Sequence, residues 1–166
     1  WGGELPCWGV STLESMAYHL GLSQGLICPV MDARRNQVYN ALFLVDNGAI
    51  TRVSEDRAIA LTDLKTELEQ IKEPIYLVGD GSDLTFKTLS GEIPALVLPP
   101  EHRLHQRAVG VALLAAKKME AGESGDGNAL TPNYLRLSQA ERERAEKMEK
   151  NKYRVWIIIN PPDQPI

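Results

Sequence analysis

Residues 24–53 read QGLICPVMDARRNQVYNALFLVDNGAITRV and contain three strand-like runs separated by short bends. The first run is largely apolar, and the second is rich in side chains that favour strands. Asn47-Gly48, between the second and third runs, is a strong signal for a two-residue hairpin. Links this short predict an antiparallel meander. The three runs are residues 26–33, 37–45 and 49–53.

A strand and a helix are expected before this meander. Residues 5–10 form a short apolar run that is typical of a strand. Ser11-Thr12-Leu13-Glu14 reads as a capping box, in which the Ser11 hydroxyl accepts from the Glu14 amide and the Glu14 side chain reaches back to the Ser11 amide. Gly21 ends the helix. The apolar face of this helix comprises Leu13, Met16, Ala17 and Leu20.

Helical and strand patterns alternate after the meander. A helix carries Leu61, Leu64, Leu68 and Ile71, with Thr62-Asp63 as the expected cap. The best helix spans residues 102–119, with an apolar stripe of Val109, Ala112, Leu113 and Ala116. The other expected elements are strands at 75–78, 95–98 and 153–159, a helical stretch to Leu89, and a charged helix at 139–150. This order predicts an α/β fold with a mixed sheet and flanking helices.

Composition limits the classes of function. The chain has 166 residues and a net charge of −4, so attraction of the whole surface to nucleic acid is not expected, although a local basic patch remains open. Cys7 and Cys28 lack the spacing of metal ligands and predict two thiols in a reducing compartment rather than a disulfide. No long apolar run predicts a membrane span.

One short motif could bind phosphate. Gly79, Asp80, Gly81 and Ser82 follow a strand, and glycines there let the backbone approach an anion. The motif is neither a full P-loop nor a dinucleotide fingerprint, so an ordinary turn is the competing interpretation.

Arginine and aromatic side chains gather in two places. Arg34, Arg35 and Tyr39 lie in and after an expected hairpin bend, and such groups can hold phosphate and stack on bases. A second group, with nearby acids that favour a solvated and self-paired helix instead, comprises Tyr134, Arg136 and Arg142. Contact with RNA or with a partner protein is the functional interpretation of both.

The residues predict no catalytic group and no metal site. His102 and His105 can share a helical face, but nothing nearby is spaced as a third ligand. Ser11 lies in no nucleophile elbow and already has a capping role. The apolar run at 153–159 is either a buried strand or a contact with another chain.

Four segments resemble the TsaB (YeaZ) family of tRNA threonylcarbamoyladenosine synthesis in order and spacing. Residues 5–14 resemble its IP…GVSSLEAL segment, and residues 32–39 its DARRGEVY hairpin. Residues 79–81 resemble its GDG turn, and residues 132–141 its P-x-YLR-x-SxAE ending. Asn36 and Gln37 stand where Gly and Glu are usual, so the bend is expected to differ in detail.

The resemblance implies a ribonuclease-H-like lobe of the actin-like ATPase fold. Residues 1–152 would be the C-terminal lobe of a TsaB-like protein, without the family's first lobe, and residues 153–166 an extra strand and tail. The implied function is a non-catalytic, cytoplasmic scaffold that activates a TsaD-like transferase beside a TsaE-like ATPase. It would meet tRNA indirectly, with ATP or ADP at the level of the complex, and a homodimer is a further expectation. Two alternatives remain open: a glycoprotease-like hydrolase using Ser11, His102 or Asp80, and a nucleotide-binding module at Gly79 to Ser82.

Overall fold

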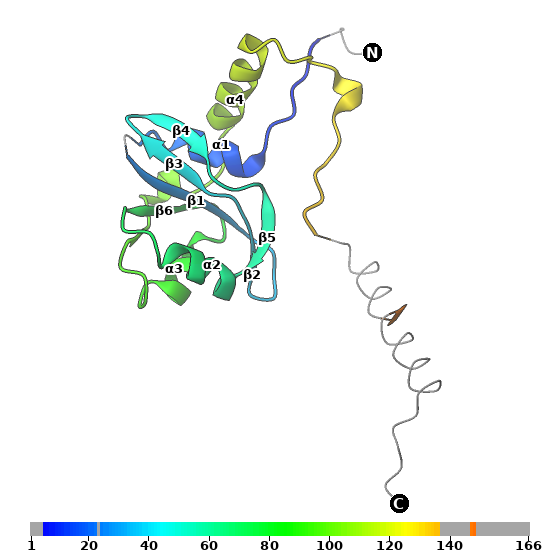
Figure 1. Ribbon diagram of the computed structural model, residues 1–166. Coiled ribbons are helices and arrows are strands. Elements are labelled where there is room, and N and C mark those ends of the chain that lie inside the picture. Colours follow the sequence, from blue (N-terminus) through cyan, green and yellow to red (C-terminus); the bar gives the residue numbers. More distant parts are fainter. Residues whose placement is uncertain (1–4, 23, 137–146, 149–166) are drawn as a thin grey trace, which may run out of the picture. The chain divides into compact units, whose positions relative to one another are not determined.

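The computed structural model describes residues 5–22, 24–136 and 147–148. Residues 1–133 form one compact unit and residues 134–166 a second, and every element named below lies in the first (Figure 1). The helices are α1 (Thr12–His19), α2 (Leu61–Leu68), α3 (Ser82–Leu89) and α4 (Ala108–Glu120), with 3-10 turns η1 (Glu101–Arg103) and η2 (Gly127–Ala129). The strands are β1 (Gln24–Asp32), β2 (Gln37–Asn40), β3 (Phe43–Asp46), β4 (Ala49–Arg52), β5 (Arg57–Ala60), β6 (Ile75–Val78) and β7 (Leu96–Val97).

The predicted antiparallel meander is confirmed, and its first strand begins two residues earlier than the expected run. β1 pairs with β3 from Gln24↔Asp46 and with β2 up to Asp32↔Val38, at one constant offset. β2 and β3 are therefore two parts of one strand. β4 and β5 likewise follow each other along the outer side of this strand, but their offsets differ by two residues. Residues 53–56 absorb that difference as a bulge, and it hid β5 from the sequence pattern.

Two parallel strands complete the sheet. β6 pairs with β1, and β7 pairs with β6, both in parallel, so the main order is β4-β3-β1-β6-β7. Parallel neighbours need crossover connections, and α2 and α3 provide them, before and after β6. The expected mixed sheet with flanking helices is thus confirmed.

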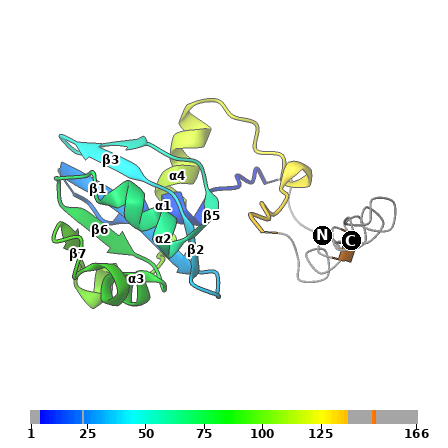
Figure 2. The same cartoon turned by 60° about the horizontal axis from the view of Figure 1, so that its bottom comes forward.

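Apolar side chains leave the sheet on both faces because successive strand residues alternate. Leu26, Cys28 and Val30 of β1 lie in a core cluster with residues of α2 and α3. Ile27 of β1 packs instead with α1, in a second cluster. The two layers of helices are visible on opposite faces of the sheet in Figures 1 and 2. The expected helical face of α1, namely Leu13, Met16, Ala17 and Leu20, is fully buried.

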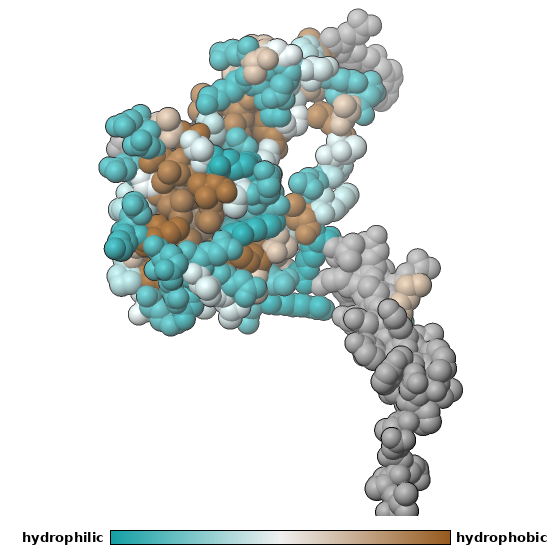
Figure 3. Space-filling view, viewed as in Figure 1, coloured by the Kyte–Doolittle hydropathy of each residue, from teal (hydrophilic) through white to brown (hydrophobic). Residues whose placement is uncertain are grey.

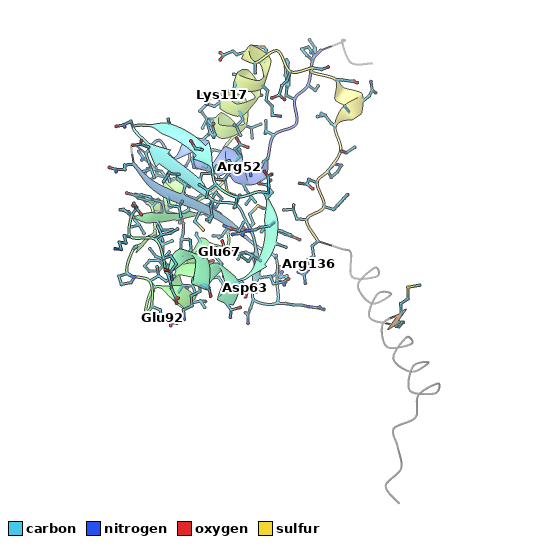
Figure 4. All side chains as sticks on the ribbon, in the orientation of Figure 1. Arg52, Asp63, Glu67, Glu92, Lys117 and Arg136 are labelled. Atoms are coloured by element: carbon cyan, nitrogen blue, oxygen red, sulfur yellow. The ribbon has the colours of Figure 1, made fainter. Side chains whose placement is uncertain are left out.

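The first helix is capped differently from the expected box. The Ser11 hydroxyl accepts from the Glu14 amide at 3.1 Å, as predicted. The Glu14 carboxylate instead bonds Arg52 of β4 at 2.6 Å, so the reciprocal half of the box is wrong. Arg52 also bonds Asp56 at 2.7 Å and lies over the Phe43 ring. This cation, labelled in Figure 4, ties the start of α1 to the third strand of the meander.

Several expected boundaries are wrong for identifiable reasons. Residues 5–10 are extended but form no strand, because no neighbouring strand among the described residues pairs with them. Ala60, not Thr62-Asp63, is the N-cap of α2, since β5 runs directly into that helix. The helix expected from residue 102 begins at Ala108, and His102 lies in a 3-10 turn. The expected elements at 139–150 and 153–159 fall outside the described residues, apart from positions 147–148.

α4 buries the face opposite to the one that its apolar stripe suggested. It packs on α1 through Gly110 and Leu114, whereas Val109, Ala112 and Leu113 are exposed. Gly110 explains the choice, because a Cβ there would lie only 2.0 Å from the carbonyl oxygen of Ser15 in α1. The absent side chain lets the two helix backbones meet.

We expect Gly110→Ala to destabilise the chain by about 2–3 kcal/mol, although alanine is the better helix former by about 1 kcal/mol. The added methyl group would push α1 and α4 apart. Urea unfolding checks the sign, with Gly91→Ala as the control because a Cβ at Gly91 meets nothing within 4 Å. A stabilised Gly110→Ala variant would show that propensity outweighs this contact.

Half of one sheet face is covered by no helix within the part of the chain that the structure describes. α2 and α3 cover β1 and β6, but Leu44 of β3 and Val53 beyond β4 remain exposed on the same side. Leu44 stands beside Leu26 of β1 and Thr51 of β4 in the register of the sheet. Figure 3 shows the resulting apolar area where the two helices leave the sheet bare.

Candidate functional site at the carboxyl ends of β1 and β6

The candidate site lies where β1 and β6 end side by side. The two strands are parallel, so Asp32 at the end of β1 and Gly79 just after β6 reach the same edge of the sheet. Open α/β sheets bind ligands outside the carboxyl ends of parallel strands. The turn of Gly79 to Ser82 and the hairpin bend after Asp32 both belong to this edge.

Close packing against β1 requires the two glycines of the turn. Gly79 has φ +106°, and a Cβ on it would lie 2.2 Å from the carbonyl oxygen of Val30. A Cβ on Gly81 would lie 3.1 Å from the Asp32 nitrogen. The glycines therefore let the turn touch the backbone of β1, whether or not an anion ever binds.

Most of the turn's donors already have partners. The Gly79 amide donates to Leu104 O at 2.6 Å, and the Gly81 amide to Val30 O at 3.1 Å. The Ser82 amide and hydroxyl both donate to Gly79 O, at 3.1 and 2.7 Å. A phosphate would have to replace these bonds or use other donors, and phosphate binding at this turn stays a prediction.

Asp32, Asp80 and Arg34 are coupled at this edge. One Asp80 carboxylate oxygen accepts from the Asp32 amide at 3.3 Å. The Asp32 carboxylate accepts from the Arg34 amide at 2.7 Å and lies 3.4 Å from the Arg34 guanidinium. The turn after β6 and the hairpin after β1 are thereby linked.

The hairpin tip holds three consecutive residues in the left-handed region. The φ angles are +65° at Arg34, +56° at Arg35 and +56° at Asn36. Asparagine tolerates this conformation well and here occupies the position where the family motif has glycine. For the two arginines it costs about 1 kcal/mol or more each. The tip keeps both at the surface, and the Arg34 side chain is 86% exposed.

The remaining residues of the predicted contact set are more scattered. Tyr39 lies on β2, partly buried against the cluster beneath α1, so its ring is not at the hairpin tip. Tyr134 is exposed and Arg136 is half-buried, and both belong to the second unit. Arg142 lies outside the described residues. Within the first unit, the structure thus links Arg34 to the Gly79 turn through Asp32 and Asp80, and Arg35 follows Arg34 on the same hairpin tip.

The serine and histidine candidates occupy structural positions. The Ser11 hydroxyl donates to Asp56 at 2.5 Å while it caps α1. A His19 ring nitrogen lies 3.1 Å from Arg103 O, which anchors the loop that carries His102 and His105. Within the described ranges, no group of three or more His, Cys, Asp or Glu side chains could hold a metal ion. No helix there is long and apolar enough to cross a membrane.

Sequence reasoning missed a buried polar centre next to this edge. Asn40, fully buried, donates to Pro29 O at 3.0 Å, to Ala41 O at 3.1 Å and to the Cys28 sulfur at 3.3 Å. Its own oxygen accepts from Arg57, which also pairs with Glu67. The available signal was Pro29. A proline inside a central strand has no N–H to donate to the ladder, so another group must donate in its place.

Both thiols are free, as expected, but Cys7 is exposed and only Cys28 is buried. Burial raises the pKa of Cys28 from 9.0 to about 12, and the bond from Asn40 opposes this only in part. Above about pH 9 the thiol ionises in the unfolded chain and not in the folded one, so the native state binds more protons. We therefore expect the free energy of unfolding to fall as pH rises from about 9 towards 12, by up to about 1.4 kcal/mol per unit.

Urea unfolding between about pH 8 and pH 10 would measure this slope. Cys28→Ala should flatten it, and Cys7→Ala should leave it unchanged because Cys7 is exposed. Equal slopes in both variants would contradict the assignment to Cys28.

The search of curated proteins and the search of solved structures both find proteins described as TsaB or YeaZ. No family model matches the chain. The chain is 30% identical over 152 residues to the tRNA threonylcarbamoyladenosine biosynthesis protein TsaB of Bacillus subtilis (strain 168), which covers 90% of this chain and 64% of that protein. The fold matches YeaZ from Pseudomonas aeruginosa with a TM-score of 0.52 and 17% identity, covering 78% of this chain and 60% of that one.

A second solved structure, described as an uncharacterized protein with similarity to peptidase YeaZ from Pseudomonas aeruginosa, matches with a TM-score of 0.54 and 18% identity. It covers 79% of this chain and 59% of that one. The resemblance to the TsaB (YeaZ) family and the expected lobe of the actin-like ATPase fold are confirmed. The chain spans just under two thirds of the length of the relatives that it matches.

Proposed function

We propose that this chain is the C-terminal lobe of a TsaB-like protein and serves threonylcarbamoyladenosine synthesis in tRNA as a non-catalytic scaffold. The observation that carries this proposal is the 30% identity over 152 residues to a protein of that pathway. The YeaZ-like fold supports it independently. The Ser11 hydroxyl, engaged with Asp56 and with the Glu14 amide, gives no support to the hydrolase alternative.

The scaffold role implies partners. In this proposal the chain works in the cytoplasm, activates a TsaD-like transferase beside a TsaE-like ATPase, and meets tRNA within their complex. A homodimer is a further partner arrangement in this proposal. Nucleotide at the Gly79 turn is a separate part of the proposal, and stabilisation of the chain against heat by ATP or ADP would support it.

A chimera tests the central claim. This chain would replace the matching 152 residues of the Bacillus subtilis relative, in cells depleted of their own TsaB. Restored threonylcarbamoyladenosine, measured by mass spectrometry of digested tRNA, is the expected result. A chimera that is folded and abundant but leaves the modification absent would overturn the proposal.

Arg34 and Arg35 are the proposed tRNA contact of this lobe within the complex. Both are exposed on a hairpin tip, in a left-handed conformation that glycine would adopt without strain. Arg35→Gly should therefore keep or raise the stability of the chain while the complex loses affinity for a tRNA transcript. The slope of log affinity against log salt concentration should become shallower by about one unit, the value expected for the loss of one phosphate contact.

The matched control for this contact is Lys72→Gln, which removes one exposed cation elsewhere. It should leave both tRNA affinity and the salt slope unchanged. If Arg35→Gly weakens assembly of the protein complex instead, the tip contacts a protein and the tRNA assignment is wrong.

A further inference from the structure

We propose that Asn47, in the turn between β3 and β4, is a site of spontaneous covalent modification, where the side-chain amide is lost as ammonia and aspartate or isoaspartate remains. The chain carries out the reaction itself, with water as the co-reactant. This inference concerns a feature that the proposed function does not use, so it stands whether or not the chain serves tRNA modification.

The sequence distinguishes Asn47 from the other asparagines. It is the only asparagine of the 166-residue chain that is followed by glycine. Asparagine is one of the thermolabile side chains. A following glycine has no Cβ to shield its peptide nitrogen from attack on the asparagine side chain. The other asparagines precede larger residues, and Asn40 is fully buried as well.

The turn leaves both reacting groups exposed to solvent. Residues 46–49 are all exposed, and a Cβ on Gly48 would meet nothing within 4 Å. The ladder between the strands closes at Asp46↔Ala49, and no group among the described residues accepts a hydrogen bond from the Gly48 amide. The Asn47 amide nitrogen donates to the exposed Asp46 carboxylate at 3.1 Å. The described core residues thus hold neither the Gly48 nitrogen nor the Asn47 side chain in place.

The atoms of this turn supply a complete reaction. The Gly48 nitrogen attacks Cγ of Asn47 and forms a C–N bond, which closes a cyclic imide. The bond from Cγ to Nδ2 breaks, and the proton of the Gly48 nitrogen ends on the departing group, which leaves as ammonia. Water then opens the imide at either carbonyl. Attack at Cγ gives aspartate, and attack at the main-chain carbonyl gives isoaspartate, in which the chain continues through Cγ.

The fold controls the rate of this reaction. Asn47 and Gly48 have φ +49° and +79°, and Cγ reaches the Gly48 nitrogen only when Asn47 rotates out of this turn conformation. The rotation needs only local opening of the hairpin end, because among the described strands β4 pairs with β3 alone. We therefore expect the folded chain to react more slowly than the urea-unfolded chain, but at the same residue.

Two aspartate–glycine pairs could form the same imide but are poorly placed for it. The Gly81 amide donates to Val30 O at 3.1 Å, and Gly81 is buried against the backbone of β1, so its nitrogen is not free to attack Asp80. The Asp126 carboxylate accepts from the Asn128 amide at 2.9 Å, which holds it in a local turn. An ionised carboxylate also has no amide to lose. The reaction is therefore expected at Asn47 first.

The two products disturb the hairpin to different extents. Aspartate at this position puts a second carboxylate beside Asp46 in place of a hydrogen-bond donor. Isoaspartate also adds a carbon atom to the main chain, within a two-residue turn whose length sets the register of β3 and β4. β4 carries Arg52, which bonds Glu14 at the start of α1 (Figure 4). The isoaspartate form should therefore be the less stable of the two.

Peptide mapping of the folded full chain by mass spectrometry tests the proposal. The chain is kept at slightly alkaline pH and physiological temperature, and samples are digested after increasing times. We expect Asn47 to lose its amide at least about tenfold faster than Asn128, which is also exposed but is followed by alanine. Gly48→Ala should slow the loss by a similar factor, because the added Cβ shields the attacking nitrogen. Circular dichroism should show that this variant remains folded.

A parallel sample in urea separates the chemistry from the effect of the fold, and faster loss at Asn47 is expected there. Loss of the amide in urea but not in the folded chain would overturn the proposal, because the turn would then protect Asn47. Equal rates at Asn47 and Asn128 in the folded chain, or an unchanged rate in Gly48→Ala, would overturn it as well.

The products allow a second measurement. Ion exchange separates them from the unmodified chain because each carries one more negative charge. We expect the urea midpoint to fall in the order unmodified chain, aspartate form, isoaspartate form, and Asn47→Asp should match the aspartate form. Higher salt should reduce the loss in the aspartate form, since it screens the repulsion from Asp46. Equal midpoints in all forms would overturn the stated effect on the hairpin.

Discussion

Gly79→Ala is expected to leave the chain largely unfolded. Alanine at φ +106° is strained by about 1–3 kcal/mol, and its Cβ would lie 2.2 Å from the Val30 carbonyl oxygen, which belongs to the central strand. Neither backbone can move away, because Gly79 is tied to Leu104 and Val30 accepts from Gly81. We expect a total cost of at least about 4 kcal/mol, a large share of the stability of a small domain.

Circular dichroism and urea unfolding would measure this loss. Gly48→Ala is the informative control, since Gly48 also has positive φ but a Cβ there meets nothing within 4 Å. It should cost only about 1 kcal/mol, the strain alone. Equal costs at the two positions would mean that the contact with Val30 contributes nothing. If Gly79→Ala folds, the fold does not require glycine at this position. A binding role for the glycines of the turn would then be favoured.

Asn40→Ala has the second largest expected effect, a loss of about 3–4 kcal/mol. The substitution removes the donor that satisfies Pro29 O and Ala41 O, and it leaves the Arg57 guanidinium without the Asn40 oxygen. Buried carbonyls without donors cost about 1–3 kcal/mol each, and water cannot easily replace the amide beside the fully buried Cys28. The cavity left by the side chain adds to the loss.

Urea unfolding would measure the midpoint for Asn40→Ala beside Asn128→Ala. Asn128 is exposed and its side chain bonds the neighbouring Asp126, so its loss should fall within about 0.5 kcal/mol. A cost below about 1 kcal/mol at Asn40 would show that the network around Pro29 is replaced by water.

The sequence predicts the strands of the meander well because their signals are local. Asn47 and Gly48 both have positive φ, as the hairpin turn favoured by this dipeptide requires. The alternation of side chains along the strands on either side follows from that turn. β5 was missed because residues 53–56 shift the register by two, which breaks the pattern without ending the strand. The bulge arises because β4 and β5 pair with β3 and β2 at different offsets, and no local propensity encodes that difference.

The orientation of α4 was not predictable from periodicity. Its sequence AVGVALLAA is apolar on almost every side, so the stripe at Val109 and Leu113 is not distinguished by composition from the side that carries Leu114. Gly110 determines which side of α4 is buried, because only its side of the helix can approach Ser15 so closely. A glycine inside an apolar helix was the available signal.

At the candidate site, too, local features were predictable and contacts between distant residues were not. The turn after β6 and the bend after β1 were both predicted, because glycine and strand-end residues mark them locally. Their linkage through Asp80 and the Asp32 amide, and the contact of Gly79 with Leu104, depend on parallel pairing of strands far apart in the chain. The expected helix over residues 102–107 concealed that last contact.

The pairing of β1 determines where insertions and deletions can be tolerated in this chain. β2, β3 and β6 all pair with β1, so one inserted residue in β1 would turn side chains of both core clusters to the wrong face. The outer strand is different, since residues 53–56 already take up two extra positions between β4 and β5. Insertions and deletions among homologues should therefore accumulate at this bulge and at the hairpin ends, and spare residues 24–32.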